Sequence, residues 1–306
     1  MGYIAGIGGA NVDVNGRCDK PLIMYDSNPG QLKASLGGVC RNICENLARL
    51  GERVKLVSVV GNDINGRNIL EGSREAGIDT RHILMLDGET SSSYISVADA
   101  SGNMVLAMSD MRIIKHLNEE LVNRSMEVLC GADLVVCDGN LSSRAVERLV
   151  KVCRRPLYLD PVSTTWAREL KPYIGYFDTV KPNRMELEEL SGCPCDTLEN
   201  MELACDILRG KGVRQVYVSL GEEGMMLRGL HGTTRMTSRP VKPVNVTGAG
   251  DASMAGIIYA ARHGMTPEES VSFSMACGIA ALMSEETIHP GIGLEMIERI
   301  RKEYIL

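Results

Sequence analysis

From about residue 120 onward, short apolar runs alternate with segments whose apolar residues recur at helical spacing. The run ADLVVCDG (132–139) is apolar on both faces, and SSRAVERLVKVC (142–153) has helical periodicity. The same alternation predicts further strands over 155–162 and 213–221 and helices over 184–192 and 200–212. Strands that are apolar on both faces need helices on both sides. The sequence therefore predicts an α/β fold: a doubly wound, mostly parallel sheet with helices on both faces.

The first third of the chain departs from this alternation. After a predicted strand, YIAGIGGANVDV (3–14), the segment 16–36 is polar and rich in turn residues. Residues 80–108 alternate polar and apolar side chains, with turn signals between the runs. We predict that roughly 14–36 and 88–108 form a small antiparallel β lid on the core. Since no long polar linker interrupts the chain, we expect residues 1–306 to form a single domain.

The composition excludes several partners. A net charge of −6 provides no basic face, and one Trp with two Phe leaves few stacking platforms, so a nucleic-acid polymer is not expected. No run of about 18 apolar residues could span a bilayer, and the chain does not start with a charged and then an apolar segment. The ten scattered cysteines favour reduced side chains. We expect a cytoplasmic protein without a membrane partner.

The stretch VNVTGAGDASMAG (244–256) is the main chemical signal. Gly248, Ala249 and Gly250 leave backbone N–H groups free to converge on an anion, just before a helix predicted from Ala252. A carboxylate there would repel a phosphate unless it accepts a proton, as a general base does when a hydroxyl attacks phosphorus. Asp251 is a candidate for that base. An N-cap role explains it equally well, because Asp favours that position.

Two further motifs could serve a nucleotide. Asn183 and Glu186 lie three residues apart at a predicted helix start, where their oxygens could organise Mg²⁺ through water. A capping box explains the same spacing. In the segment SLGEEG (219–224), the glycines could admit phosphates and ribose close to the main chain, although a plain hairpin fits too. No Walker A loop or full dinucleotide-binding fingerprint is present.

Near the N-terminus, polar residues end one strand and glycines open the next helix. Asn11 and Asp13 come at the end of the first predicted strand, and Gly38 and Asn42 open the helix over 40–51. An Asp, an Asn and a glycine pair can bind the adjacent hydroxyls of a ribose. A cap and a turn are the alternative reading.

Together these motifs resemble the ribokinase-like (pfkB) family of sugar and nucleoside kinases. The GGVCRN helix entry, the KPN-x-x-E element, the S-x-G-x-x-G turn and the NVTGAGD motif occur in the family's order and separations, over essentially the whole chain. The resemblance implies an ATP- and Mg²⁺-dependent phosphotransferase with an alcohol group as acceptor. The stretches YDSNPG, TSSSYISV and AMSDM look most like the family's pseudouridine kinases, which phosphorylate the 5′-hydroxyl of that nucleoside.

The resemblance also implies a role for each matching residue. Asp251 is the implied catalytic base, with the N–H groups of Gly248, Ala249 and Gly250 as the anion hole. The implied nucleotide and metal ligands are Asn183, Glu186, Ser219, Gly221 and Gly224. The implied acceptor-binding residues are Asn11, Asp13, Gly38, Asn42, Ser93 and Tyr94.

The resemblance leaves the monovalent cation and the acceptor open. Asn245 stands where many relatives begin the signature with Asp, so the loss of a charge removes the basis for a firm K⁺ prediction. The resemblance also allows ribose or another nucleoside as acceptor, or a nucleoside-binding regulator that kept the fold. Since an exposed sheet edge and apolar face invite pairing, we expect a homodimer through the lid.

Overall fold

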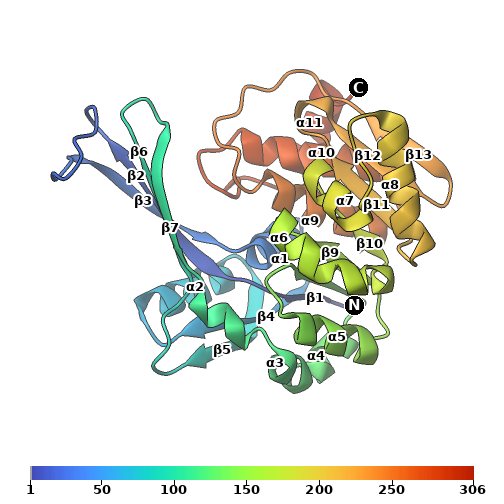
Figure 1. The fold of residues 1–306 in the computed structure, drawn as a ribbon, viewed down its shortest axis with the longest axis horizontal. Helices are drawn as coiled ribbons and strands as arrows, with labels where there is room; N and C mark the ends of the chain where they lie inside the picture. The colour runs from blue at the N-terminus through green and yellow to red at the C-terminus, as the bar shows by residue number, and fades with distance from the viewer. Residues whose placement is uncertain (1) are drawn as a thin grey trace.

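The central sheet has nine strands in the order β13-β12-β11-β10-β9-β8-β1-β4-β5 (Figure 1). The computed structural model describes residues 2–306. The strands from β5 to β11 pair in parallel, and only β11-β12 and β12-β13 are antiparallel. The strands are β1 (Ile4–Ile7), β4 (Val54–Gly61), β5 (Ile78–Leu86), β8 (Leu134–Asp138), β9 (Leu157–Asp160), β10 (Thr179–Val180), β11 (Gln215–Ser219), β12 (Met225–Gly229) and β13 (Gly232–Met236).

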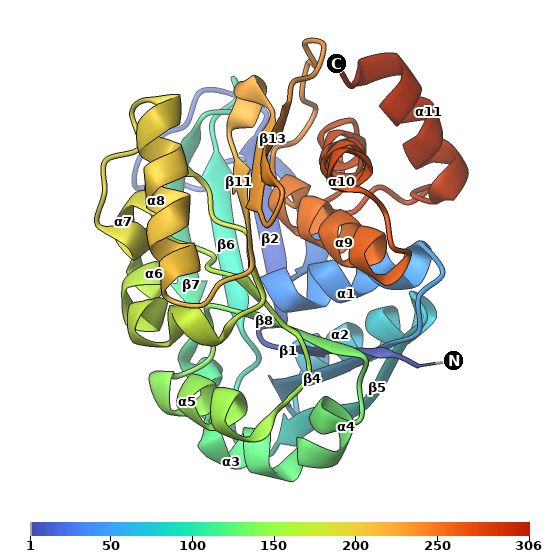
Figure 2. The ribbon, with the colours of Figure 1, turned by 90° about the vertical axis from the view of Figure 1, so that its right-hand side faces the viewer.

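Helices cover both faces of this sheet (Figure 2). Side chains alternate along each strand, so Val136 of β8 packs into one apolar cluster and Val135 into the other. The mostly parallel, doubly wound sheet is therefore confirmed. The helices are α1 (Val39–Arg49), α2 (Ile64–Glu75), α3 (Glu119–Arg124), α4 (Met126–Cys130), α5 (Ser143–Val152), α6 (Thr164–Leu170), α7 (Arg184–Ser191), α8 (Leu198–Gly210), α9 (Ala249–Arg262), α10 (Pro267–Leu282) and α11 (Leu294–Tyr304), with short 3₁₀ turns at Arg112–His116, Lys171–Tyr176 and Gly221–Glu223.

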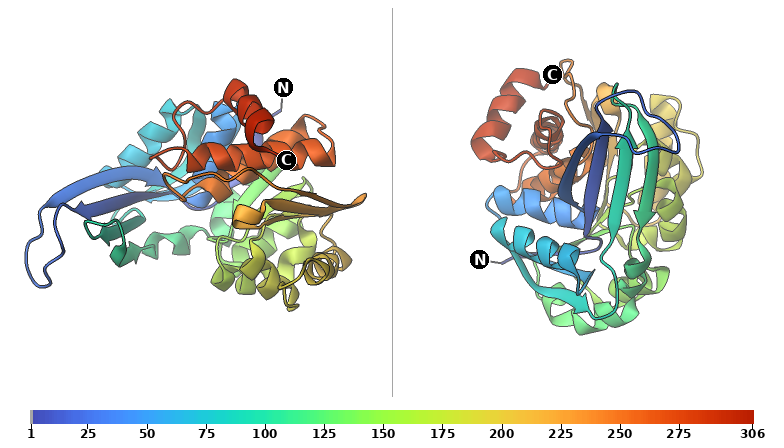
Figure 3. Two further views of the ribbon diagram at one scale, coloured as in Figure 1. Left: turned by 90° about the horizontal axis from the view of Figure 1, so that it is seen from above. Right: turned by 90° about the vertical axis from the view of Figure 1, so that its left-hand side faces the viewer.

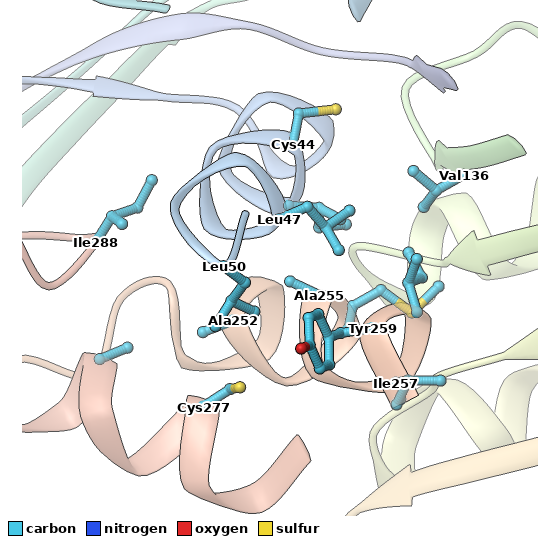
Figure 4. Packing of buried hydrophobic residues seen from close by; sticks show 14 of the residues in the cluster. Cys44, Leu47, Leu50, Val136, Ala252, Ala255, Ile257, Tyr259, Cys277 and Ile288 are labelled. Carbon is cyan, nitrogen blue, oxygen red and sulfur yellow. The ribbon is translucent and has the colours of Figure 1, made fainter. Parts of the chain in front are cut away.

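Helices α1 and α9 pack directly against each other (Figure 4). Leu47 and Leu50 of α1 lie toward the small residues Ala255 and Ala252 of α9, which let the two helices approach closely. On the other side of α9, a Cβ on Gly256 would lie 2.7 Å from the Cα of Ser274 in α10. This packing holds the first turn of α9 in a fixed position beside α1.

A second, four-stranded sheet projects from the core as the predicted lid (Figures 1 and 3). Its strand order is β3-β2-β6-β7, with antiparallel pairs β2-β3 and β6-β7 joined by a parallel β2-β6 pair. The lid strands begin and end a few residues away from the predicted bounds: β2 (Asn11–Cys18), β3 (Gly30–Gly37), β6 (Ser93–Ala98) and β7 (Met104–Asp110).

The first strand predicted from the sequence, over 3–14, is in fact two strands. β1 lies in the central sheet and β2 in the lid, and the chain changes sheets at Gly8 and Gly9. A Cβ on Gly8 would lie 2.5 Å from the Asp138 carboxylate, and the Gly9 N–H donates to the same carboxylate. Residues 80–86, which alternate as the lid strands do, belong instead to β5 at the edge of the central sheet.

Within residues 2–306, none of the helices combines the length and the apolar character that a bilayer crossing requires.

Candidate active site

Asp251 lies in the first turn of α9. The helix begins at Ala249, three residues earlier than predicted, with Gly248 as its N-cap. The N-cap reading of Asp251 is therefore wrong, because Asp251 is the third helical residue. Gly248 has a φ of 84°, and a Cβ there would lie 2.2 Å from the Thr287 carbonyl oxygen, so only glycine fits. The first N–H groups of a helix have no partner within it and can receive an anion.

The Asp251 carboxylate faces the start of α1. Asn42 Nδ2 donates to Asp251 Oδ2 over 2.8 Å. Burial and the nearby charge of Asp160 raise the pKa of Asp251 from 3.8 to about 7, while the Asn42 hydrogen bond and Lys181 oppose the rise. A carboxylate with a pKa near 7 is suited to general-base catalysis at neutral pH.

Two further carboxylates lie close to Asp251, and sequence analysis missed both. Asp138 ends β8 and accepts hydrogen bonds from the N–H groups of Gly9 (3.0 Å), Cys40 (2.9 Å) and Asn140 (3.0 Å). Asp138 thereby connects Gly9, where the chain passes from the central sheet to the lid, to the start of α1. Asp160 ends β9 and forms a buried ion pair with Lys181 at 3.0 Å. Each Asp is the last residue of a parallel strand, and such sheets bind ligands at these strand ends. An Asp at the end of a predicted buried strand could therefore have identified both residues from the sequence.

Asn183 and Glu186 form a capping box at the start of α7. Asn183 Oδ1 accepts from the Glu186 N–H, and Glu186 Oε2 accepts from the Asn183 N–H, each over 2.9 Å. The capping alternative is therefore confirmed. Glu186 is buried, which raises the pKa of its carboxyl group. The capping box does not use its second oxygen, Oε1.

The described residues fit a metal that is held in part by substrate. Within residues 2–306, no group of three or more His, Cys, Asp or Glu side chains could hold an ion. Mg²⁺ usually keeps several waters and binds one or two carboxylates together with phosphates, so a complete protein cage is not required. Glu186 can supply such a carboxylate, and Asn183 an amide oxygen.

The segment 219–224 forms the turn between β11 and β12. These strands pair antiparallel with Ser219 opposite Met225, so the hairpin reading is confirmed. Gly221 and Gly224 have φ values of 61° and 94°. The Ser219 N–H donates to the Pro182 carbonyl over 3.1 Å, which joins this turn to the start of α7. The two predicted nucleotide motifs therefore lie side by side.

On the acceptor side, the structure brings together the ends of β2 and α1. Asn11 Nδ2 donates to Asp13 Oδ1 over 2.6 Å, and burial raises the pKa of Asp13. A Cβ on Gly37 would lie 2.2 Å from the Asp13 carboxylate. Gly38 has a φ of 98° and is the N-cap of α1, and Asn42 follows one turn later. Gly37 thus gives the Asp13 carboxylate room, and Gly38 lets α1 begin close to the backbone of Gly9 and Ala10.

The strand register separates Ser93 from Tyr94. Asp13 pairs with Tyr94, so these two side chains share one face of the lid. Ser93 pairs with Val12 on the opposite face, where its hydroxyl accepts from Asn65 Nδ2 at 3.2 Å. The structure therefore brings Tyr94, but not Ser93, to the face that carries Asp13.

Asn245 is engaged within its own loop. Its Oδ1 accepts from the Thr247 N–H over 2.9 Å, and its Nδ2 donates to the Glu285 carbonyl over 3.4 Å. Such a turn uses the side-chain oxygen that a cation would need.

Two sets of residues thus meet at the start of α9. The capping box and the β11-β12 turn lie on the side of Lys181, next to Gly250, while β2 and α1 lie on the side of Asn42, which contacts Asp251.

A family model described as pfkB family carbohydrate kinase matches residues 1–292 of the 306. The chain belongs to this family. It is therefore a kinase, a phosphotransferase with an alcohol group as acceptor.

Within the pfkB family, the chain is 35% identical to a pseudouridine kinase from Escherichia coli over 295 residues, which is 95% of this chain and 94% of that one. It is 28% identical to a guanosine-inosine kinase from Exiguobacterium acetylicum, over 98% of this chain and 100% of the other. A solved ribokinase from Arabidopsis thaliana, complexed with ribose and ATP, matches with a TM-score of 0.83 at 20% identity, over 99% of each chain. At that identity, the likeness bears on the fold alone.

Proposed function

We propose that this chain transfers the γ-phosphoryl group of ATP to the 5′-hydroxyl of a nucleoside, with pseudouridine as the acceptor. The observation that carries the proposal is the position of Asp251, in the first turn of α9 with its carboxylate held by Asn42 at 2.8 Å. This position puts a base with a pKa of about 7 beside free helix N–H groups.

The proposed reaction is a direct in-line transfer. Asp251 accepts the proton of the attacking hydroxyl, and the N–H groups of Gly248, Ala249 and Gly250 receive the oxygens of the transferred group. Asp13, Asn11, Gly38 and Asn42 hold the ribose, and Tyr94 on the same lid face meets the base. Ser219, Gly221 and Gly224 contact ATP. Glu186 and Asn183 would hold Mg²⁺, which would neutralise phosphate charge.

Support for pseudouridine comes from the 35% identity to the Escherichia coli enzyme over nearly the full length of both chains. The match to a guanosine-inosine kinase covers as much of this chain at lower identity, and it favours another nucleoside as the second candidate. Both relatives are named as nucleoside kinases, which supports a nucleoside over free ribose.

An activity screen tests the proposal. Purified protein is incubated with ATP, Mg²⁺ and either pseudouridine, uridine, cytidine, adenosine, guanosine or ribose, and ADP release is measured. We expect the highest kcat/KM with pseudouridine. Asp251→Asn is the matched control: it should bind ATP as the wild type does and lose about 10²- to 10⁴-fold in kcat, the usual contribution of a general base. A higher kcat/KM with any other acceptor would refute pseudouridine as the substrate.

We also propose that two copies pair through the lid. The register places Leu32, Ile95, Leu106 and Met108 on the lid face opposite to Asp13 and Tyr94. Their exposed fractions are 80%, 45%, 59% and 67%. An apolar surface of this kind on a projecting sheet favours burial against a partner, and a second copy offers the same surface.

A further inference from the structure

Lys181 follows β10 and is a buried cation beside the first turn of α9. Its side chain is 5% exposed, and its ammonium lies 3.0 Å from Asp160 Oδ2. A Cβ on Gly250 would lie 3.5 Å from Lys181 Nζ, so the glycine leaves the ammonium next to the first turn of α9. An ammonium has three donors. Within residues 2–306, Asp160 is the one group seen in hydrogen-bonding or ion-pairing distance of it.

Asp160 is itself held by a strained turn. Its Oδ1 accepts from the Val162 N–H over 3.0 Å. Val162 has a φ of 69°, a conformation that a β-branched residue rarely adopts, and the Ser163 N–H donates to the Pro161 carbonyl over 2.8 Å. Backbone strain of this type gathers at functional sites, where the surroundings keep it in place. The turn holds the carboxylate that faces Lys181.

The carboxylates around Lys181 keep its ammonium charged. Asp160, Glu186 and Asp251 all act on it, and although burial lowers the pKa of Lys181, these carboxylates raise it on balance. Asp138 is occupied by three backbone N–H groups, and Asn42 is the neutral group that faces Asp251 from α1. Lys181 thus stays protonated at neutral pH and is the one cation seen to act on Asp251 among the described residues.

We propose that Lys181 is a further catalytic residue of the proposed kinase reaction, and that Asp160 is a positioning residue that holds its ammonium. The inference rests on the proposed function. During transfer, the bond between the γ-phosphorus and the oxygen of the leaving ADP breaks, and a bond from the acceptor oxygen to that phosphorus forms. The acceptor proton goes to Asp251. Lys181 keeps its protons and donates hydrogen bonds to the oxygens of the travelling group.

The test separates catalysis from folding through a double variant. Lys181→Met alone leaves Asp160 buried without its partner and can unfold the chain. Lys181→Met combined with Asp160→Asn removes both charges and keeps the volumes. Lys151→Met is the matched control, because Lys151 lies on the exposed face of α5. We expect the double variant to melt near the wild type and to lose about 10²- to 10³-fold in kcat, with a KM for the acceptor within about threefold.

A binding measurement gives a second readout. The probe is ADP with Mg²⁺, aluminium fluoride and the acceptor, which mimics the group in flight, and ATP with Mg²⁺ is the ground-state comparison. Because Lys181 acts on the travelling group, the double variant should lose much more affinity for the mimic than for ATP. Equal losses for the two ligands would overturn the inference.

The outcomes distinguish this inference from the function on which it rests. A wild-type protein that phosphorylates no acceptor would refute the proposed function, and this inference with it. An active wild type whose double variant retains kcat within about threefold would overturn only the role of Lys181, which would then be structural. A folded double variant with low kcat and selective loss of the mimic supports the role.

Discussion

At the scale of single residues, the surroundings of Asp251 favour one protonation state and its proposed role as a base requires the other. Burial and the Asp160 charge favour its protonated form, whereas a general base must be ionised. The ionised form of Asp251 is stabilised by the helix N-terminus, by Asn42 and by Lys181, and these interactions offset part of the effect of burial. The pKa of about 7 is the result of this balance.

The balance predicts the pH dependence of turnover. Since Asp251 acts as the base only when ionised, kcat/KM should rise with pH through an apparent pKa of about 7 and then level off. Below pH 6, the rate should fall about tenfold for each pH unit. The measurement is kcat/KM between pH 5 and 9. A profile that is flat from pH 5 to 8 would exclude Asp251 as the titrating base.

The stability of Asp251→Asn is the control for this assignment. A carboxyl whose pKa is raised by folding stabilises the folded state below its unfolded pKa, near 4, and that stabilisation is lost as pH rises through about 7. Asn does not titrate, so the variant should unfold like the wild type at pH 4. At pH 8 its free energy of unfolding should be higher by about 1–3 kcal/mol. Urea unfolding at both values gives the comparison.

Residue by residue, the sequence revealed the groups that lie within motifs. Asp251 directly follows Gly248, Ala249 and Gly250, so the four adjacent residues 248–251 suffice to suggest a base beside an anion site. Asp160 and Lys181 are 21 positions apart and meet only because β9 and β10 are neighbours. A pair of this kind depends on strand order, which a single sequence does not state.

At the scale of elements, α7 shows how one motif can serve two purposes. Asn183 and Glu186 cap the helix, and the same geometry fixes the Glu186 carboxylate at the strand end that faces α9. Capping therefore does not argue against a metal role. It is a way to hold a buried carboxylate in one rotamer.

Glu186→Gln separates the two roles. Glutamine retains a capping box, so the helix should be as stable as in the wild type, but it removes the charge that would attract Mg²⁺. We expect the Mg²⁺ concentration for half-maximal activity to rise by about tenfold or more. The matched control is Glu269→Gln, in the equivalent capping box at the start of α10. The same Mg²⁺ dependence in both variants would limit Glu186 to its structural role.

Element boundaries were predicted least well where tertiary contacts set them. The predicted strand over 3–14 splits at Gly8 because the Asp138 carboxylate occupies the space that a continuous strand with side chains would need. The early start of α9 follows from the positive φ of Gly248, which Thr287 enforces from a distant loop. The spacing of apolar residues in the sequence reveals neither the contact between Asp138 and Gly8 nor the contact between Thr287 and Gly248.

At the scale of the whole molecule, the lid has two chemically different faces. Asn11, Asp13 and Tyr94 lie on one face, and the exposed apolar side chains, including Leu106 and Met108, lie on the other. The alternation of polar and apolar residues predicted the lid, and the observed register assigns a face to each residue. A single sequence could not provide that register, because β2 and β6 are far apart in the chain and pair in parallel.

The apolar lid face predicts a dimer that one charge should break. The wild type should run in solution at twice the 33.3 kDa of the chain. Leu106→Glu places a carboxylate within the predicted interface, where burying it without a partner is costly, so this variant should be a monomer at the same concentration. Leu230→Glu, at the exposed β12-β13 turn, is the matched control and should remain a dimer. Sedimentation velocity of the three proteins at one concentration distinguishes these states. A monomeric wild type, or a Leu106→Glu variant that stays dimeric, would show that this face is not the dimer interface.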